Sequence, residues 1–170
     1  VGSKGSAFIF PVAIETTEKV GVKLQVYNAP FILGKIHIFK DSEVEFLKDA
    51  LPHVQLIRGS VFVSTAGSQV IITSPLLPNE IILLTGGQIL VEVGRVNINV
   101  WCVDGQCEII RAGESVNTVH PLTRSVYFNN DGYAEMESNT QIVSSLVDAL
   151  KLYNLGCDSC INVNALYPPK

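Results

Sequence analysis

Residues 101–107 read Trp-Cys-Val-Asp-Gly-Gln-Cys, and they constrain the fold more than any other part of the chain. Asp-Gly is a strong signal for a two-residue β-hairpin, because a type I′ turn needs positive φ at both central positions. With Asp104 and Gly105 in the turn, Cys102 faces Cys107 across a non-hydrogen-bonded pair whose Cα atoms lie about 4.5 Å apart. That separation lies within the disulfide range of about 4.4–6.8 Å. The sequence therefore predicts a hairpin, its register and a disulfide bond.

Short apolar segments with alternating polar residues occupy most of the chain, and residues typical of turns separate them. The first segment contains Pro11, which favours an edge strand. The predicted strands span residues 7–14, 20–27, 31–39, 54–57, 60–64, 69–73, 80–84, 88–93, 96–103, 106–110, 115–119, 125–128 and 133–136. Many short strands joined by glycine-rich turns predict a mainly β fold, an antiparallel β-sandwich or roll.

Two segments have helical features. Residues 41–47 begin with Asp41 and Ser42, either of which could cap a short helix that ends before Pro52. After residue 138 the apolar residues fall at helical spacing, with Ser138 or Asn139 as the N-cap and a glycine at the C-terminal end. These apolar positions are Ile142, Val143, Leu146, Val147 and Leu150. The pattern predicts one C-terminal amphipathic α-helix packed on the back of the sheet.

The change of pattern at residue 138 divides the chain into two parts. Residues 1–137 form the predicted all-β domain, and residues 138–170 form the predicted helix with a short tail. Cys157 and Cys160 lie just beyond the helix and are predicted to staple that tail with a second disulfide.

Composition narrows the classes of partner. Hydrophobic residues make up 47% of the chain and charged residues only 16%, below the usual quarter, which favours a very complete core or a face covered by a partner. The 12 basic residues are scattered and the net charge is −4, so we predict no nucleic-acid binding. No apolar run has the roughly 18–20 residues of a transmembrane helix. The chain begins at Val1 without an initiator Met, so we expect a mature or trimmed form from which a signal peptide or anchor could have been removed.

The four cysteines allow several interpretations. Two local disulfides, Cys102–Cys107 and Cys157–Cys160, indicate an oxidising, extracytoplasmic compartment. A single zinc site with four thiolate ligands is an alternative, because zinc ligands often come as closely spaced pairs. Free or mixed thiols are another. A redox role for the second pair is disfavoured, because catalytic dithiols sit at a helix N-terminus, where the helix dipole lowers the thiol pKa, and this pair follows a helix C-terminus.

Other chemistry has weaker support. His37, His53 and His120 are far apart and form no metal-binding motif. A cupin-like metal-binding roll that uses Glu108, Glu114 and His120 is kept as an alternative. No nucleophile elbow and no phosphate-binding glycine loop occur. We therefore predict no catalytic residue, no cofactor and no metal, and a protein that is not an enzyme.

Residues 57–119 resemble a FecR-type domain, the periplasmic sensor module first known from ferric-citrate signalling. The resemblance lies in four stretches: Val-Ile-Ile-Thr-Ser-Pro at 70–75, Gly-Gly-Gln-Ile-Leu-Val-Glu-Val at 86–93, the strand at 96–100 continuing through 103–109, and Arg-Ala-Gly-Glu-Ser-Val at 111–116. It implies an extracytoplasmic all-β module that binds a ligand or a protein, with no catalytic residues. FecR regulators also carry a cytoplasmic anti-sigma segment and a transmembrane helix, which this chain lacks, and the two cysteines around Asp104-Gly105 are not typical of them.

The function hypothesis that follows is a non-enzymatic extracytoplasmic β-domain that mediates protein–protein interaction. It would act in envelope signalling or in a surface or membrane-associated assembly, through an exposed strand or an aliphatic sheet face. The alternative is a self-assembling structural subunit, such as a filament, coat or adhesin subunit, because the same composition suits self-association.

Overall fold

The computed structural model describes residues 12–17, 22–28, 31–48, 51–119, 123–130 and 133–139, and these residues are mainly β. The strands are β1 (Val12–Glu15), β2 (Val22–Asn28), β3 (Phe31–Ile38), β4 (Glu43–Lys48), β5 (Pro52–Ser74), β6 (Leu77–Val93), β7 (Asn97–Arg111), β8 (Glu114–Val119), β9 (Thr123–Asn130) and β10 (Tyr133–Asn139). The predicted mainly β class is therefore confirmed. No helix occurs among these residues, and accordingly none of them forms a helix long and apolar enough to cross a membrane.

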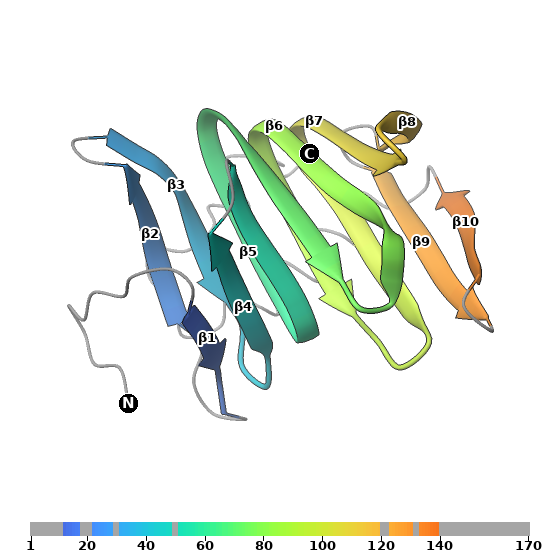
Figure 1. Ribbon diagram of the computed structural model, residues 1–170, viewed down its shortest axis with the longest axis horizontal. Helices are drawn as coiled ribbons and strands as arrows, with labels where there is room; N and C mark the ends of the chain where they lie inside the picture. The colour runs from blue at the N-terminus through green and yellow to red at the C-terminus, as the bar shows by residue number, and fades with distance from the viewer. Residues whose placement is uncertain are drawn as a thin grey trace, which may run out of the picture.

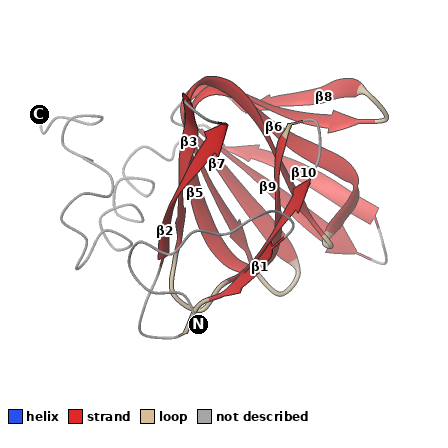
Figure 2. Cartoon of the chain, turned by 60° about the vertical axis from the view of Figure 1, so that its left-hand side comes forward, coloured by secondary structure: helices blue, strands red, loops and turns tan. Residues whose placement is uncertain are grey.

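All ten strands belong to one sheet, and every pairing among the described strands is antiparallel. The main path runs β1-β4-β5-β6-β7-β9-β10, with β3 and β2 attached to β5, and β8 attached to β7. Figure 1 shows these strands side by side, from β2 at one end to β10 at the other. Figure 2 shows that the sheet is strongly curved.

Three strands are far longer than the sequence predicts. β5 has 23 residues, β6 has 17 and β7 has 15, and each contains two or three of the predicted short strands. The prediction of many short strands is wrong, because a glycine can either lie in a turn that ends a strand or let the strand bend and continue. Some glycine positions, such as Gly94 and Gly113, lie in true turns between strands, whereas Gly59 and Gly87 lie inside strands that bend and continue.

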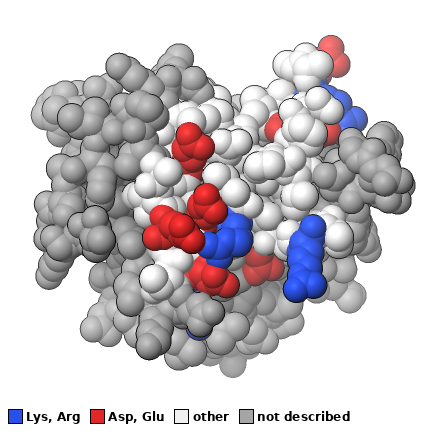
Figure 3. Space-filling model, turned by 60° about the horizontal axis from the view of Figure 1, so that its bottom comes forward, with Lys and Arg blue, Asp and Glu red and all other residues white. Residues whose placement is uncertain are grey.

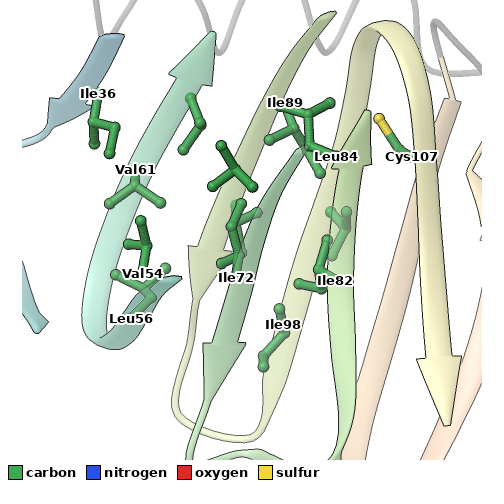
Figure 4. Close-up of a cluster of buried hydrophobic side chains, with 14 of the residues drawn as sticks. Ile36, Val54, Leu56, Val61, Ile72, Ile82, Leu84, Ile89, Ile98 and Cys107 are labelled. Carbon is green, nitrogen blue, oxygen red and sulfur yellow. The ribbon is translucent and has the colours of Figure 1, made fainter. Parts of the chain in front are cut away.

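One hydrophobic cluster fills the inside of the curved sheet (Figure 4). It takes side chains from both halves of the long strands, for example Val61 and Ile72 of β5, and Leu84 and Ile89 of β6. Burial alternates along the strands, because successive side chains point to opposite faces. The bends therefore bring two parts of the same strand around one core.

The predicted short helix at residues 41–47 is wrong, because residues 43–48 form β4, paired with β1 and β5. Val44 and Phe46 are 0% and 1% exposed, while Glu43 and Glu45 between them are partly exposed. That alternation is the strand period, and pairing on both edges outweighs the modest helix preference of glutamate. Asp41 has φ +56°, so it makes a turn into β4 rather than a helix cap.

A buried polar cluster ties the turn before β4 to β1 and β5. The Ser42 N–H donates to Thr16 Oγ1 at 2.8 Å, and Thr16 Oγ1 donates to the Phe39 carbonyl at 2.6 Å. The Ser60 N–H donates to Ser42 Oγ at 2.9 Å. Thr16, Ser42 and Ser60 are at most 6% exposed, and their hydrogen bonds to one another remove the cost of burying them.

The predicted C-terminal helix gains no support, because no helix occurs among the described residues and its two candidate N-caps, Ser138 and Asn139, are the last two residues of β10. These two residues pair with Ser125 and Arg124 of β9, which extends the sheet past the predicted domain boundary. The apolar stripe from Ile142 to Leu150 and the predicted Cys157–Cys160 disulfide lie outside the described residues.

Candidate interaction surface and cysteine pair

Glycine residues on three neighbouring strands line up to form a crease in the sheet. Gly87 of β6 pairs with Thr65 of β5 on one side and with Gly105 of β7 on the other. Gly67 lies in the same region of β5, where the pairing with β6 shifts between Thr65 and Gln69. All three strands therefore bend at the same level, and we call this region the glycine crease.

The backbones of β6 and β7 touch at the crease. A Cβ atom on Gly105 would lie 2.8 Å from the Gly87 Cα and closer still to the Gly86 carbonyl oxygen. A Cβ atom on Gly87 would lie 2.6 Å from the Gly105 Cα. Gly105 also has φ +86°, in the region that side chains other than glycine rarely adopt. Only glycine satisfies both the space and the backbone angle here.

Cys102 and Cys107 lie on either side of the crease in β7. Their Cα atoms are 5.9 Å apart and their sulfur atoms 2.06 Å apart, so the pair has the geometry of a disulfide. Five residues of straight strand would separate the same Cα atoms by about 16 Å. Both side chains are 0% exposed and belong to the core cluster. The pair therefore clamps the bend of β7 from inside the core.

The predicted hairpin around this pair is wrong. Asp104 and Gly105 do not reverse the chain, because β7 continues along β6 through a shift in register. Cys102 pairs with Ile89, and Cys107 pairs with Leu84. The prediction failed because the neighbouring strand β6 bends in the same place and follows β7 through the crease.

The two-residue turn with positive φ lies at the end of β7, where the chain reverses into β8. Ala112 and Gly113 have φ +51° and +81°, and Arg111 pairs with Glu114 across them. These angles fit the type I′ turn that joins paired antiparallel strands. The β7–β8 hairpin is therefore made by Ala-Gly, which is a weaker sequence signal than Asp-Gly.

A zinc site shared by all four cysteines stays untested, because Cys157 and Cys160 lie outside the described residues. Within the described ranges, no group of three or more histidine, cysteine or acidic side chains is close enough to hold a metal ion.

The cupin-like alternative gains no support. Glu108 pairs with Thr118, and Glu114 pairs with Arg111, so the two carboxylates lie three rungs apart along the β7–β8 ladder. That spacing is about 10 Å. His120 lies outside the described residues. His53 Nε2 lies 2.7 Å from Thr73 Oγ1, a contact that joins the two ends of β5.

β8 is the most exposed strand among those with described side chains. Residues 114–116 and Thr118 are exposed, and Val119 is buried. Among the described strands, β8 pairs with β7 alone, along residues 107–111, whereas β9 takes the first half of β7. Figure 2 shows the β7–β8 hairpin at the periphery of the molecule. We call β8 and its outer edge the β8 edge.

Val116 is the central residue of the β8 edge. The register of β7 with β8 passes from Asn117 to Ser115, so Val116 is the extra residue of a β-bulge. Its side chain is 44% exposed, and Val96 in the β6–β7 turn, at 61%, is the other large apolar side chain found exposed within the described ranges. The sequence marks the strand, but it does not mark which strand stands at an open edge.

A partly buried ion pair fixes β7 to β6 directly before the turn of the same hairpin. Arg111 Nε and Nη2 donate to Glu80 Oε1 at 2.9 and 2.6 Å. Glu80 and Arg111 are directly paired across β6 and β7, and the Glu80 side chain is only 5% exposed. A charge-assisted, two-donor contact of this kind orients the strand that leads into the β8 edge.

Another face of the molecule carries a mixed-charge cluster (Figure 3). Arg58 Nη1 and Nη2 donate to Asp41 and to Glu15, respectively. All three side chains are substantially exposed, so this cluster contributes little to stability and presents no excess of positive charge.

No family model matches this chain, and no curated protein matches it. Solved structures do. The chain is similar to two crystal structures, each of a "putative anti-sigma factor" from Parabacteroides distasonis ATCC 8503, at 1.65 and 2.50 Å resolution. The first has a TM-score of 0.58 at 12% identity over 80% of this chain, and the second 0.57 at 13% identity over 84%. This chain spans 64% of the first protein and 75% of the second. At such low identity the likeness establishes a shared fold.

Proposed function

We propose that this chain is a non-enzymatic, extracytoplasmic protein-binding domain that acts in bacterial envelope signalling. The observation that carries the proposal is the fold shared with two structures named as anti-sigma factors, over most of this chain. The resemblance of residues 57–119 to FecR-type domains supports the same class and rests on sequence motifs alone.

The cysteine pair supports the proposed extracytoplasmic compartment. Two buried sulfur atoms at bonding distance suit a structural disulfide, and such bonds persist outside the cytoplasm. A disulfide at the crease would hold the bend of β7 covalently.

The β8 edge is the surface that we assign to the partner. An exposed edge strand offers backbone N–H and C=O groups to an added strand, and an extended segment of a partner protein is the occupant that fits them. β9 pairs with the first half of β7 and β8 with the second half, so among the described strands it is the outer side of β8 that carries no further strand.

The test uses a strain of the source organism that lacks the gene and is complemented with the wild-type chain, Val116→Lys or Val96→Lys. A lysine on an edge strand opposes strand addition, and both substitutions replace an exposed valine. We expect deletion to change a restricted set of transcripts that share one promoter sequence. The wild-type and Val96→Lys chains should restore their levels, and Val116→Lys should not. A deletion without any coherent transcriptional change would overturn the signalling proposal. Equal complementation by both variants would contradict the assignment of the β8 edge as the partner-binding surface.

A further inference from the structure

The disulfide joins the two residues of β7 at which its neighbour in the sheet changes. The first half of β7 pairs with β9, and the last rung of that ladder joins Cys102 to Thr123. The second half pairs with β8, and the first rung there joins Cys107 to Val119. The Cys102–Cys107 bond therefore connects the half of β7 that carries β9 to the half that carries β8.

The two sides of β7 cross the glycine crease differently. On one side, β6 runs along β7 from Glu80 to Val93, so that a single strand spans the bend. On the other side, β9 lies along the first half and β8 along the second, and among the described strands no single strand spans the bend there. Strand pairing therefore supports the bend of β7 from one side only, and the disulfide is a second, covalent constraint on it.

The disulfide lies directly against the backbone of the crease. Cys102 Sγ is 3.8 Å from the carbonyl oxygens of both Asp104 and Gly105. Both cysteine side chains belong to the core cluster, together with their partners in the β6 ladder, Ile89 and Leu84. Thiol–disulfide exchange needs access to a sulfur atom, so a reductant reaches this bond only when β7 opens locally at the crease.

The position of β8 depends on the second half of β7. Among the described strands, β8 pairs with β7 alone, in a ladder that runs from Cys107 to the rung of Arg111 with Glu114 beside the hairpin turn. Any change in the course of β7 after Cys107 therefore moves the whole of β8 with it. The disulfide thus sets where the β8 edge, with Val116 at its centre, lies relative to the rest of the sheet.

We propose that the Cys102–Cys107 disulfide is a redox clamp that holds the β8 edge in its partner-binding position, an inference that rests on the proposed function of that edge. Reduction by a dithiol breaks the S–S bond. Two electrons and two protons pass to the two cysteines, which become thiols, and the dithiol becomes a disulfide. The reduced β7 keeps its ladder with β6, but its second half and β8 open at the crease more often. Oxidation by a disulfide restores the clamp.

Amide hydrogen exchange, measured by mass spectrometry on the full chain, tests the clamp without any partner. The chain carries Cys157→Ala and Cys160→Ala, so that dithiothreitol acts on the disulfide of β7 alone. We expect reduction to raise the exchange rate several-fold in residues 106–119 and to leave residues 97–101, which pair with β9, close to their rate in the oxidised chain. A rate that rises equally in both segments, or in neither, would overturn the proposal.

A matched variant separates the clamp from a general loss of stability. Ser42→Ala removes a buried hydrogen-bond acceptor at the other bend of β5, and it should lower the free energy of unfolding by an amount similar to loss of the disulfide. The double variant Cys102→Ala with Cys107→Ala should exchange several-fold faster than Ser42→Ala in residues 106–119. Equal rates in that segment would mean that destabilisation alone opens β8, and the proposal would be wrong.

A photoreactive benzoylphenylalanine at position 116 tests the consequence for binding in cells of the source organism. We expect the chain with both β7 cysteines to cross-link a protein partner, and the chain with Cys102→Ala and Cys107→Ala to do so several-fold less. Equal cross-linking by the two chains would contradict the clamp and leave the proposed function intact. No cross-link from the chain with both cysteines would contradict the proposed function, and with it the role of the clamp in binding.

Discussion

β5 bends twice, and the two bends are closed in different ways. At Gly59 the bend packs against the turn before β4, because a Cβ atom on Gly59 would lie 2.6 Å from the Ser42 Cα. The Ser42 hydroxyl fills the space beside Gly59. At the glycine crease the neighbouring strands bend together, and β6 and β7 close the bend against each other. The first bend depends on buried hydrogen bonds, and the second on backbone contact and a cysteine pair.

The comparison shows that glycine has two separable roles. Gly105 is required for both its positive φ and its lack of a side chain, whereas Gly67 has φ +95° but no atom within 4 Å of a Cβ position. Substitutions at these sites separate the cost of the backbone angle from the cost of the contact.

The largest effect is expected for Gly105→Ala. The left-handed backbone angle costs about 1–2 kcal/mol and the overlap with β6 about 1–3 kcal/mol, so the free energy of unfolding should fall by about 3 kcal/mol or more. Urea unfolding followed by circular dichroism measures it. A loss no greater than that of Gly67→Ala would show that β6 and β7 do not touch at the crease.

The double variant Cys102→Ala with Cys107→Ala comes next. The closed loop is very short, so loss of the cross-link should reduce the free energy of unfolding by about 2 kcal/mol, the low end of the usual range. The wild-type chain unfolded with reductant is the control and should lose a similar amount. Alkylation of the unreduced, denatured protein at both cysteines would contradict the disulfide itself.

Ser42→Ala tests the other bend. It leaves the buried Ser60 N–H without its acceptor, which should cost about 1–3 kcal/mol. Ser115→Ala, on the exposed β8 edge, is the matched control and should change stability little. Equal losses would mean that the buried polar cluster does not hold the Gly59 bend.

The smallest effect in this comparison is expected for Gly67→Ala. Only the backbone angle opposes the new methyl group, so the loss should be about 1 kcal/mol. Thermal unfolding monitored by tryptophan fluorescence resolves a change of this size. A loss equal to that of Gly105→Ala would show that the contact between β6 and β7 adds no cost beyond that of the backbone angle.

Much of the fold could be predicted from the sequence, and the errors have one cause. The alternation at Val20–Tyr27 and Phe31–Phe39 located β2 and β3 closely. The cysteine pair was also correctly brought together. The alternation does not say whether a glycine reverses a strand or bends it, because that depends on what the neighbouring strand does. Asp104-Gly105 bends its strand, whereas Ala112-Gly113, where both residues have positive φ, reverses it.

The candidate interaction surface was harder to predict from the sequence than the fold. An edge strand and a central strand have similar patterns, so the exposure of Val116 follows from topology and not from its neighbours in the chain. The burial of Phe62, Leu90 and Trp101 on the face opposite the core cluster does leave a signal. The continuous apolar runs at residues 61–63, 89–91 and 100–103 indicate strands buried on both faces.

The central claim, that the β8 edge binds a protein partner, is tested most directly by photo-cross-linking in cells of the source organism. A photoreactive residue is placed at Val116 or, as the control, at Val96. Our account predicts one defined cross-linked protein from position 116, lost when Glu114 and Thr118 are both replaced by proline to block the edge, and none from position 96. Cross-linking of the same proteins from both positions, or from neither, would contradict it.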